Sequence, residues 1–486
     1  MGLALACPSA GFSFVWDDPY LIKNNPAITG NFSFAGLFSS TLVLKDGPTA
    51  FFRPLQIMTH ALEHRVFGAN PAGYHAVSAA LHAAASVLVF FAGLVFAPAG
   101  WGAFAGALVF AAHPAHAEAA SFISARGDLL STCFALLAFL SSVAAASALD
   151  SRRLWVASAG AGAAYFASLL SKETGVLIPV LLVAWPWLRQ GPPAGSLPRR
   201  RAAVALAAAL TVGFAAYLAV RVGASGVGLG EIRMDFDPGG AFRRLTAYLR
   251  MLVDPGALQI WWPAVAPGWT GGSLVGAALL AVSFSLAWRL RSRASWLLFA
   301  WGWFFLSLLP VLKLVPFPGS DLATRYLYLP SAALSWAVAC LWGSVEGLAR
   351  PRRALAVAAG AAFLTLSAWL WFRETRAWRD EPALYQRMVR DEPGSAMARY
   401  NLGNALAGAG RTPEAIRSLE EAVRLSPSYA SAHYNLGQYL ADAGRFAEAE
   451  NHLETYLRLR PQAPDRSFTE GLLSMVRQRA RQSGQR

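Results

Sequence analysis

Residues 74–97 read YHAVSAALHAAASVLVFFAGLVFA, a run without any Asp, Glu, Lys or Arg. A transmembrane helix needs about 20 mainly apolar residues to cross the hydrocarbon core of a bilayer. Nine further apolar runs follow, near 100–113, 128–148, 154–170, 173–189, 202–221, 272–290, 295–313, 327–348 and 354–372. The sequence therefore predicts an all-α fold, with a polytopic transmembrane helical domain of about ten spans.

The composition of the chain supports a membrane protein and argues against two other classes. Of its 486 residues, 55% are hydrophobic and 14% are charged, whereas soluble domains average about 25% charged residues. The net charge is +14, but the basic residues are scattered in short clusters, so we expect no nucleic-acid partner. The three cysteines lie apart without metal-ligand spacing, so they predict neither a disulfide framework nor a cysteine metal site.

Arginine clusters predict the orientation of the spans, because basic residues near span ends stay on the cytoplasmic side. Alternate loops carry Arg152 and Arg153, then Arg189 and Arg199 to Arg201, then Arg289, Arg291 and Arg293, and finally Arg350, Arg352 and Arg353. The opposite short loops hold only Arg126, Lys172 and Arg325, with Lys313 at an edge. We therefore expect residues 14–73 and all residues after 372 to lie outside. In a bacterium this means a multi-pass protein of the inner membrane with a periplasmic C-terminal domain.

A repeat of 34 residues begins after the last apolar run. Asn401-Leu402-Gly403 recurs as Asn435-Leu436-Gly437, and Pro427 recurs as Pro461. This is the tetratricopeptide (TPR) signature of paired helices. It predicts a membrane domain over 14–378, a TPR α-solenoid over 379–463, and a capping helix with a basic tail over 464–486. The solenoid divides into a half repeat 379–395 and repeats 396–429 and 430–463. Its groove suits a protein or peptide ligand; the alternative is a spacer or assembly face.

Two aspartates, Asp17 and Asp18, stand at the edge of the membrane domain, in front of Pro19. Carboxylates near a membrane are costly and usually functional, so the pair suggests a base, a metal ligand or an ion gate. The alternative is helix capping, since Asp before Pro is a common start signal.

A second cluster contains His113, His116 and Glu118 and is followed by Arg126 and Asp128. Two histidines and a glutamate at short spacing suit a divalent metal. The alternative is a re-entrant segment whose polar groups satisfy one another.

Cations mark two more outer segments. Lys172 and Glu173 stand between two spans that barely separate, where the ammonium either approaches a phosphate or snorkels at the interface. Arg325 and Tyr326 precede the ninth run, where the guanidinium suits phosphate oxygens or anchors the span at the interface. The predicted orientation puts all four clusters on the outer side. Carboxylates for proton abstraction and cations for a lipid phosphate would then share one site.

The motifs together resemble a known family. In order they are Val15-Trp16-Asp17-Asp18, Phe52-Arg53-Pro54-Leu55, Gly73-Tyr74-His75, His113-Pro114-Ala115-His116-Ala117-Glu118, Arg126-Gly127-Asp128-Leu129-Leu130, Ser171-Lys172-Glu173 and Arg325-Tyr326-Leu327-Tyr328-Leu329-Pro330, ahead of the repeats. This arrangement resembles the transmembrane and tetratricopeptide-repeat O-mannosyltransferases, in a bacterial form, which are part of the GT-C superfamily of glycosyltransferases. The resemblance extends over nearly the whole chain.

The resemblance implies transfer of mannose or another hexose from a polyprenyl-phosphate donor to a protein hydroxyl at the outer face. The catalytic base would be Asp17 or Asp18. Substrate-binding candidates, some from charge alone, are Arg53, His113, His116, Glu118, Arg126, Asp128, Lys172, Glu173, Arg325 and Tyr326. We expect no cofactor; a divalent metal at His116, Glu118 and the aspartates is the less favoured alternative.

One departure from the family concerns the first residues. Relatives have a span before the acidic pair, whereas 13 residues precede Phe14 here, so we expect 1–13 to be a shortened remnant of that span. The functional alternatives are a GT-C enzyme that modifies glycolipid or polysaccharide, a non-catalytic TPR scaffold in the membrane, and a transporter that uses the acidic pair as an ion site.

Overall fold

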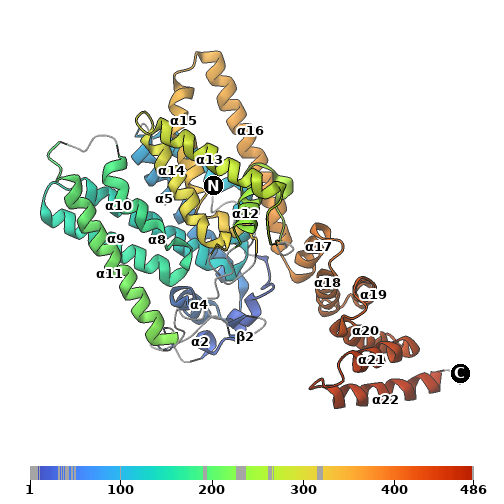
Figure 1. Cartoon of the computed structure of the whole chain (residues 1–486). Helices are drawn as coiled ribbons and strands as arrows, with labels where there is room; N and C mark the ends of the chain where they lie inside the picture. Colours follow the sequence, from blue (N-terminus) through green and yellow to red (C-terminus); the bar gives the residue numbers. More distant parts are fainter. Residues whose placement is uncertain are drawn as a thin grey trace. The chain divides into compact units, whose positions relative to one another are not determined.

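The computed structural model describes residues 9, 11–30, 33, 36, 38, 43–44, 47–48, 51–98, 100–189, 194–225, 237–260, 265, 267–314 and 321–483. Most of the expected remnant 1–13 therefore lies outside the described residues. Apart from one antiparallel pair of two-residue strands, β1 (Val43–Leu44) and β2 (Gly47–Pro48), the described regular elements are helices (Figure 1). Internal contacts divide the chain into two units, Met1–Trp378 and Arg379–Arg486.

Seven helices of the described part of the first unit are long and apolar enough to cross a membrane. They are α5 (Pro71–Phe96), α8 (Arg126–Ala146), α9 (Ser151–Ser171), α11 (Arg199–Ser225), α13 (Gly271–Leu290), α14 (Ser295–Leu308) and α16 (Arg350–Thr375). Helix α14 reaches this length only together with the 3₁₀ turn Leu309–Leu312 that continues it. Three further apolar helices are shorter, namely α6 (Trp101–Ala112), α10 (Ile178–Leu188) and α15 (Ala332–Glu346). Each of the ten expected spans thus contains an apolar helix, and the prediction of an all-α membrane protein is confirmed.

The expected starts of two of the three shorter helices were wrong. Helix α10 begins only at Ile178 and α15 only at Ala332, whereas α6 stops at Ala112, two residues before Pro114 and close to its expected end. Proline lacks an N–H and restricts the residue before it, and Pro179 and Pro330 stand near these two late starts. The polar residues predicted there therefore lie on short 3₁₀ turns, Pro114–His116, Glu173–Gly175 and Thr324–Leu327.

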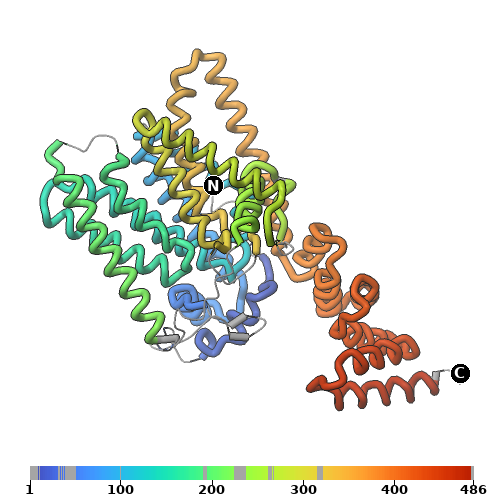
Figure 2. The backbone as a smooth tube through the Cα atoms, in the orientation of Figure 1, coloured from blue at the N-terminus to red at the C-terminus, as the bar shows by residue number. Residues whose placement is uncertain are grey.

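The connections of the first unit gather at two opposite ends. At the arginine-rich end, Leu197 N donates to Ala148 O over 2.9 Å and Arg189 Nη1 donates to Ser147 Oγ over 2.9 Å, so two loops of this end contact each other. At the other end lie the π-helix Pro19–Lys23, α2 (Pro26–Thr29), α4 (Pro54–Phe67), α7 (Ala117–Ser121) and α12 (Pro238–Val253). In the backbone trace, α4 and the turn between α15 and α16 lie at opposite ends of this unit (Figure 2).

The second unit consists of paired helices with the expected period. They are α17 (Glu381–Asp391), α18 (Ala396–Gly408), α19 (Thr412–Leu425), α20 (Ala430–Asp442), α21 (Phe446–Leu459) and α22 (Arg466–Ser483). Glycine is required where two helices of a repeat cross. A Cβ on Gly403 would lie 2.7 Å from Leu419 Cγ, and one on Gly437 would lie 2.8 Å from Leu453 Cγ.

The Gly437→Ala substitution should loosen the second repeat. The added methyl group overpacks the crossing with Leu453, which costs about 1–3 kcal/mol. Hydrogen exchange of the full chain, followed by mass spectrometry, should show faster exchange of the α20 and α21 amides by roughly tenfold or more. The matched control is Gly471→Ala in α22, where a Cβ meets nothing within 4 Å. That change should leave exchange unchanged or slow it, and equal exchange in both variants would contradict the crossing argument.

Candidate active site

The acidic pair follows a residue with a constrained backbone. Trp16 has a φ of 55°, in the left-handed region that non-glycine residues rarely adopt. Its ring centroid lies 5.9 Å from that of Phe122 and 6.4 Å from that of Trp378, and both pairs are stacked. Such outliers cluster at functional sites when surrounding contacts hold them. The stack therefore fixes the turn that presents Asp17 and Asp18.

The two aspartates occupy different environments. Asp17 is partly exposed, whereas Asp18 is fully buried. Asp18 Oδ1 accepts hydrogen bonds from Ser124 N over 2.8 Å and from Ser124 Oγ over 2.7 Å, and Asp18 Oδ2 accepts one from Val15 N over 3.2 Å. Burial raises the pKa of Asp18 to about 7, and the charge of Asp17 adds to that rise. The Asp18 carboxylate makes no cap hydrogen bond to the helix that follows, so the capping alternative is wrong for this residue.

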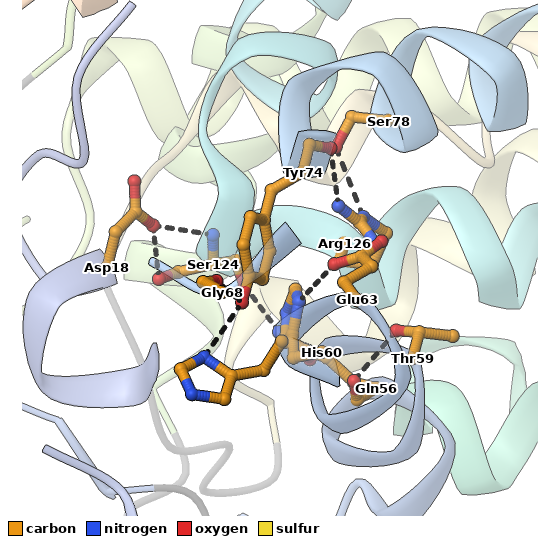
Figure 3. A network of polar contacts seen from close by, with 11 residues as sticks. Asp18, Gln56, Thr59, His60, Glu63, Gly68, Tyr74, Ser78, Ser124 and Arg126 are labelled. Carbon is orange, nitrogen blue, oxygen red and sulfur yellow. Dashed lines mark hydrogen bonds and ion pairs between the residues drawn. The ribbon is translucent and has the colours of Figure 1, made fainter. Parts of the chain in front are cut away.

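A buried polar network lies beside Asp18 (Figure 3). Arg126 forms an ion pair with Glu63, donates to Tyr74 O over 2.8 Å, and donates from Nε to Ser78 Oγ over 3.1 Å. His60 Nδ1 lies 3.1 Å from Glu63 Oε2. Arg126 is fully buried, so it joins the first turn of α8 to α4 and α5 and offers no surface to a ligand. The contacts of Arg126 with the described residues are therefore structural, and its contact with substrate stays a prediction.

Sequence reasoning missed the partners of Arg126. Gln56, His60 and Glu63 form a buried polar face on helix α4. The spacing of three between His60 and Glu63 was the one available signal for a shared face.

The two histidines of the second cluster contact the protein through both ring nitrogens. His113 Nε2 lies 3.2 Å from Leu252 O, and its Nδ1 accepts from Ala115 N over 3.3 Å. His116 Nδ1 lies 2.8 Å from Phe110 O, and its Nε2 lies 2.8 Å from Ser331 Oγ. Burial lowers the pKa of both rings, which keeps them neutral. These contacts fit the re-entrant polar segment, and they assign both histidines to holding the broken ends of α6 and α15.

Glu118 holds the segment that precedes α15. Its carboxylate accepts from Thr324 Oγ1 over 2.6 Å and from Arg325 N over 3.0 Å, and it forms an ion pair with the Arg325 guanidinium. The Arg325 Cζ lies 6.0 Å from the centroid of the Phe122 ring. Because Phe122 stacks on Trp16, Arg325 is brought near the turn that carries the acidic pair.

Two cations lie over the Tyr326 ring. Lys172 Nζ lies 4.7 Å and Arg325 Cζ 5.1 Å from the ring centroid. Lys172 Nζ also binds both oxygens of Asp128, at 2.5 and 2.6 Å. Burial lowers the pKa of Lys172 to about 8, and the charges of Arg53 and Arg325 add to this effect.

Glu173 links Arg53 to a further arginine. Its carboxylate lies 3.4 Å from Arg53 Nε and 3.4 Å from Arg221 Nη1. Arg221 was not among the predicted site residues, although it is the last residue of the apolar run 202–221. We call Arg53, Lys172, Arg221 and Arg325, with Glu118, Asp128 and Glu173, the cation cluster. Four cations face three carboxylates, so these side chains carry one net positive charge, which suits a phosphate.

Comparisons with known proteins found a family model that matches the repeats and several relatives that resemble the chain. The tetratricopeptide repeat family model matches residues 381–429 and 400–464. The human protein O-mannosyl-transferase TMTC2 is 33% identical over 183 residues, which are 37% of this chain and 22% of the human protein. Protein O-mannosyl-transferase Tmtc1 of Drosophila melanogaster is 37% identical over 132 residues, 26% of this chain and 15% of the fly protein. A protein O-mannosyl-transferase of Caenorhabditis elegans is 24% identical over 444 residues, 85% of this chain and 60% of the nematode protein.

These matches confirm the resemblance to O-mannosyltransferases that carry tetratricopeptide repeats. The aligned parts span less than two thirds of the length of these relatives, and about a fifth of the human one.

Breaking the buried Glu63–Arg126 pair should destabilise the first unit strongly. In Glu63→Gln, the Arg126 guanidinium stays buried without its counter-charge, which costs about 3–5 kcal/mol. The midpoint of thermal unfolding of the purified full chain in detergent should fall by several degrees. Arg153→Gln is the control, because it removes an ion pair with Asp150 in which both side chains are largely exposed and such pairs contribute little. Equal midpoints for the two variants would refute the structural role of Arg126.

Proposed function

We propose that this chain is a membrane glycosyltransferase that moves mannose or another hexose from a polyprenyl-phosphate donor to a protein hydroxyl. The observation that carries the proposal is a chain of contacts: Trp16, which precedes the partly exposed Asp17, stacks on Phe122, and Arg325 of the cation cluster lies over the Phe122 ring. The names of the similar proteins support the same reaction class.

Asp17 is the base in this proposal. Its partial exposure suits contact with an acceptor, whereas both oxygens of Asp18 already accept hydrogen bonds from the protein. Asp17 takes the proton of a Ser or Thr hydroxyl, and the hydroxyl oxygen attacks the anomeric carbon of the donor. The bond between that carbon and the phosphate oxygen breaks, and its electron pair leaves with the polyprenyl phosphate. A single displacement of this kind inverts the configuration of the sugar.

The cation cluster would stabilise the departing phosphate. Charge grows on the phosphate oxygens as the bond breaks, and donors fixed in advance lower the energy of that state. Arg325 and Arg53 are the direct contacts in this proposal, since their guanidinium groups match phosphate oxygens. Lys172 is buried and engaged with both Asp128 oxygens, so it contributes its charge. Glu118 orients Arg325 by accepting hydrogen bonds from its backbone N–H and its guanidinium, and it also accepts one from the neighbouring Thr324 hydroxyl.

The proposed location rests on the positions of the arginines. The arginine-rich end of the helices would face the cytoplasm, and the acidic pair and the cation cluster would then lie at the outer surface. In a bacterium this is the periplasmic side of the inner membrane, and the repeats would lie there to bind acceptor proteins. A donor linked to a membrane lipid fits a site at that surface.

The reaction is tested with purified full chain, a polyprenyl-phosphate mannose and a Ser/Thr-rich peptide, with mass spectrometry of the peptide as the readout. Mannosyl peptide is the expected product. Product only on a lipid-linked glycan acceptor would favour the polysaccharide-modifying alternative. An absence of transfer to either acceptor would favour the alternative of a non-catalytic TPR scaffold in the membrane.

The two aspartates should respond differently to removal of charge. Asp17→Asn should reduce the rate of transfer about 10²–10⁴-fold at every pH, because it removes the general base. Asp18→Asn should leave measurable transfer and flatten the dependence of the rate on pH near 7. The reason is that an aspartate with a raised pKa is ionised only above that value, so the wild-type rate should fall as the pH drops through about 7. Measurement of kcat from pH 5.5 to 9 checks both; the opposite pattern would make Asp18 the base.

Arg53→Gln should weaken donor binding more than turnover. Loss of one phosphate contact should raise KM for the donor by roughly tenfold, equivalent to about 1.4 kcal/mol, with a smaller change in kcat. Arg65→Gln on α4 is the control, since Arg65 is an exposed arginine of the same outer region. If both variants raise KM equally, only the general positive charge of this face matters, and the specific contact would be rejected.

A further inference from the structure

Ser124 makes two hydrogen bonds to a single oxygen of Asp18. Its backbone N–H and its hydroxyl both donate to Oδ1, over 2.8 and 2.7 Å (Figure 3). Ser124 lies in the 3₁₀ turn Ile123–Ala125 that joins α7 to α8, 106 residues away from Asp18 in sequence. The carboxylate thus connects the segment of the acidic pair to the start of a membrane helix.

Gln56 holds the other side of the same residue. Its Nε2 donates to Ser124 O over 2.8 Å, and Gln56 is fully buried on α4. Ser124 therefore has its N–H directed to Asp18 and its C=O directed to Gln56. Helix α4 is itself fixed to α8 by the Glu63–Arg126 pair. This arrangement leaves Ser124 little freedom to move away from Asp18.

We propose that Ser124, braced by Gln56, is a positioning residue that favours the ionised form of Asp18 and so holds the turn that aims Asp17 at the acceptor. The catalytic part of this inference rests on the proposed function; the effect on Asp18 itself does not.

The hydrogen bond from the Ser124 hydroxyl should have a measurable effect on the ionisation of Asp18. Burial and the neighbouring charge of Asp17 both oppose ionisation of Asp18, while the hydrogen bonds from Ser124 and Val15 N favour it. An ionised Asp18 can accept all three bonds; protonation places a hydrogen on one oxygen and weakens its acceptance. The Ser124 hydroxyl therefore sets the pH below which the turn loosens.

The test compares three variants of the full chain. Ser124→Ala removes the hydroxyl and leaves the backbone N–H in place. Ser124→Thr restores a hydroxyl at the same position. Ser121→Ala is the matched control, because Ser121 is buried three residues earlier and its Oγ has no hydrogen-bond partner among the described residues. Each protein is titrated by ¹³C NMR after aspartate labelling, with Asp18→Asn used to assign the signal, and transfer is measured over the same pH range.

Ser124→Ala should raise the pKa of Asp18 by about one unit or more, because a hydrogen bond to a charged group is lost. The acid limb of kcat should move up by the same amount, which reduces transfer at pH 7 roughly five- to tenfold and leaves KM for the donor unchanged. The ratio of variant to wild-type rate should return toward one at high pH. Ser124→Thr and Ser121→Ala should keep the wild-type titration and pH profile.

Two outcomes would overturn the inference: an unchanged Asp18 titration in Ser124→Ala, or an equal rate loss at all pH values together with a lowered unfolding temperature. If the wild-type chain transfers no sugar, the proposed function fails, but the Asp18 titration still decides whether Ser124 supports the carboxylate.

Discussion

The Glu63–Arg126 ion pair is the interaction on which the end of the membrane unit that carries the acidic pair depends. Removing two charges from water costs several kcal/mol per ion, and their attraction offsets this only when the remaining hydrogen-bonding groups are satisfied. Arg126 meets that condition through Tyr74 O and Ser78 Oγ, and Glu63 meets it through His60. The pair joins α4, α5 and α8. The positions of Gln56, Ser124 and finally Asp18 follow from that junction.

The acidic pair shows how environment separates two identical side chains. Asp18 faces inward, where its carboxylate is fixed by three hydrogen bonds, while Asp17 retains contact with solvent. The left-handed backbone of Trp16 and its stack on Phe122 and Trp378 separate the two directions. Pairs of carboxyl groups with divergent environments commonly take different chemical roles. In the proposed reaction, the buried aspartate supports the turn and the exposed one receives the proton.

Features that depend on local sequence were predictable, and features that depend on distant pairing were not. The apolar runs located the helices, and the 34-residue period located the repeats, because both patterns follow directly from helix geometry. The starts of α10 and α15 were predicted several residues too early, because hydropathy does not include the backbone restriction imposed by Pro179 and Pro330. The predicted orientation of the spans correctly grouped Glu118, Lys172 and Arg325 at one end of the membrane unit. The ion pairs Asp128–Lys172, Glu63–Arg126 and Glu118–Arg325 join residues that are 44 to 207 positions apart in sequence. No local pattern shows which of these residues pair.

The balance of charge in the cation cluster bears on how a phosphate would be bound and released. Four unpaired cations at the membrane surface would bind phosphate tightly before and after the reaction, and equal binding of both states does not accelerate the chemical step. Carboxylate partners reduce that attraction and also fix the geometry, as Glu118 does for Arg325 and Asp128 does for Lys172. The single net positive charge that remains favours the state in which the phosphate gains negative charge. A leaving polyprenyl phosphate would then be stabilised in the transition state, while the paired cations limit retention of the product.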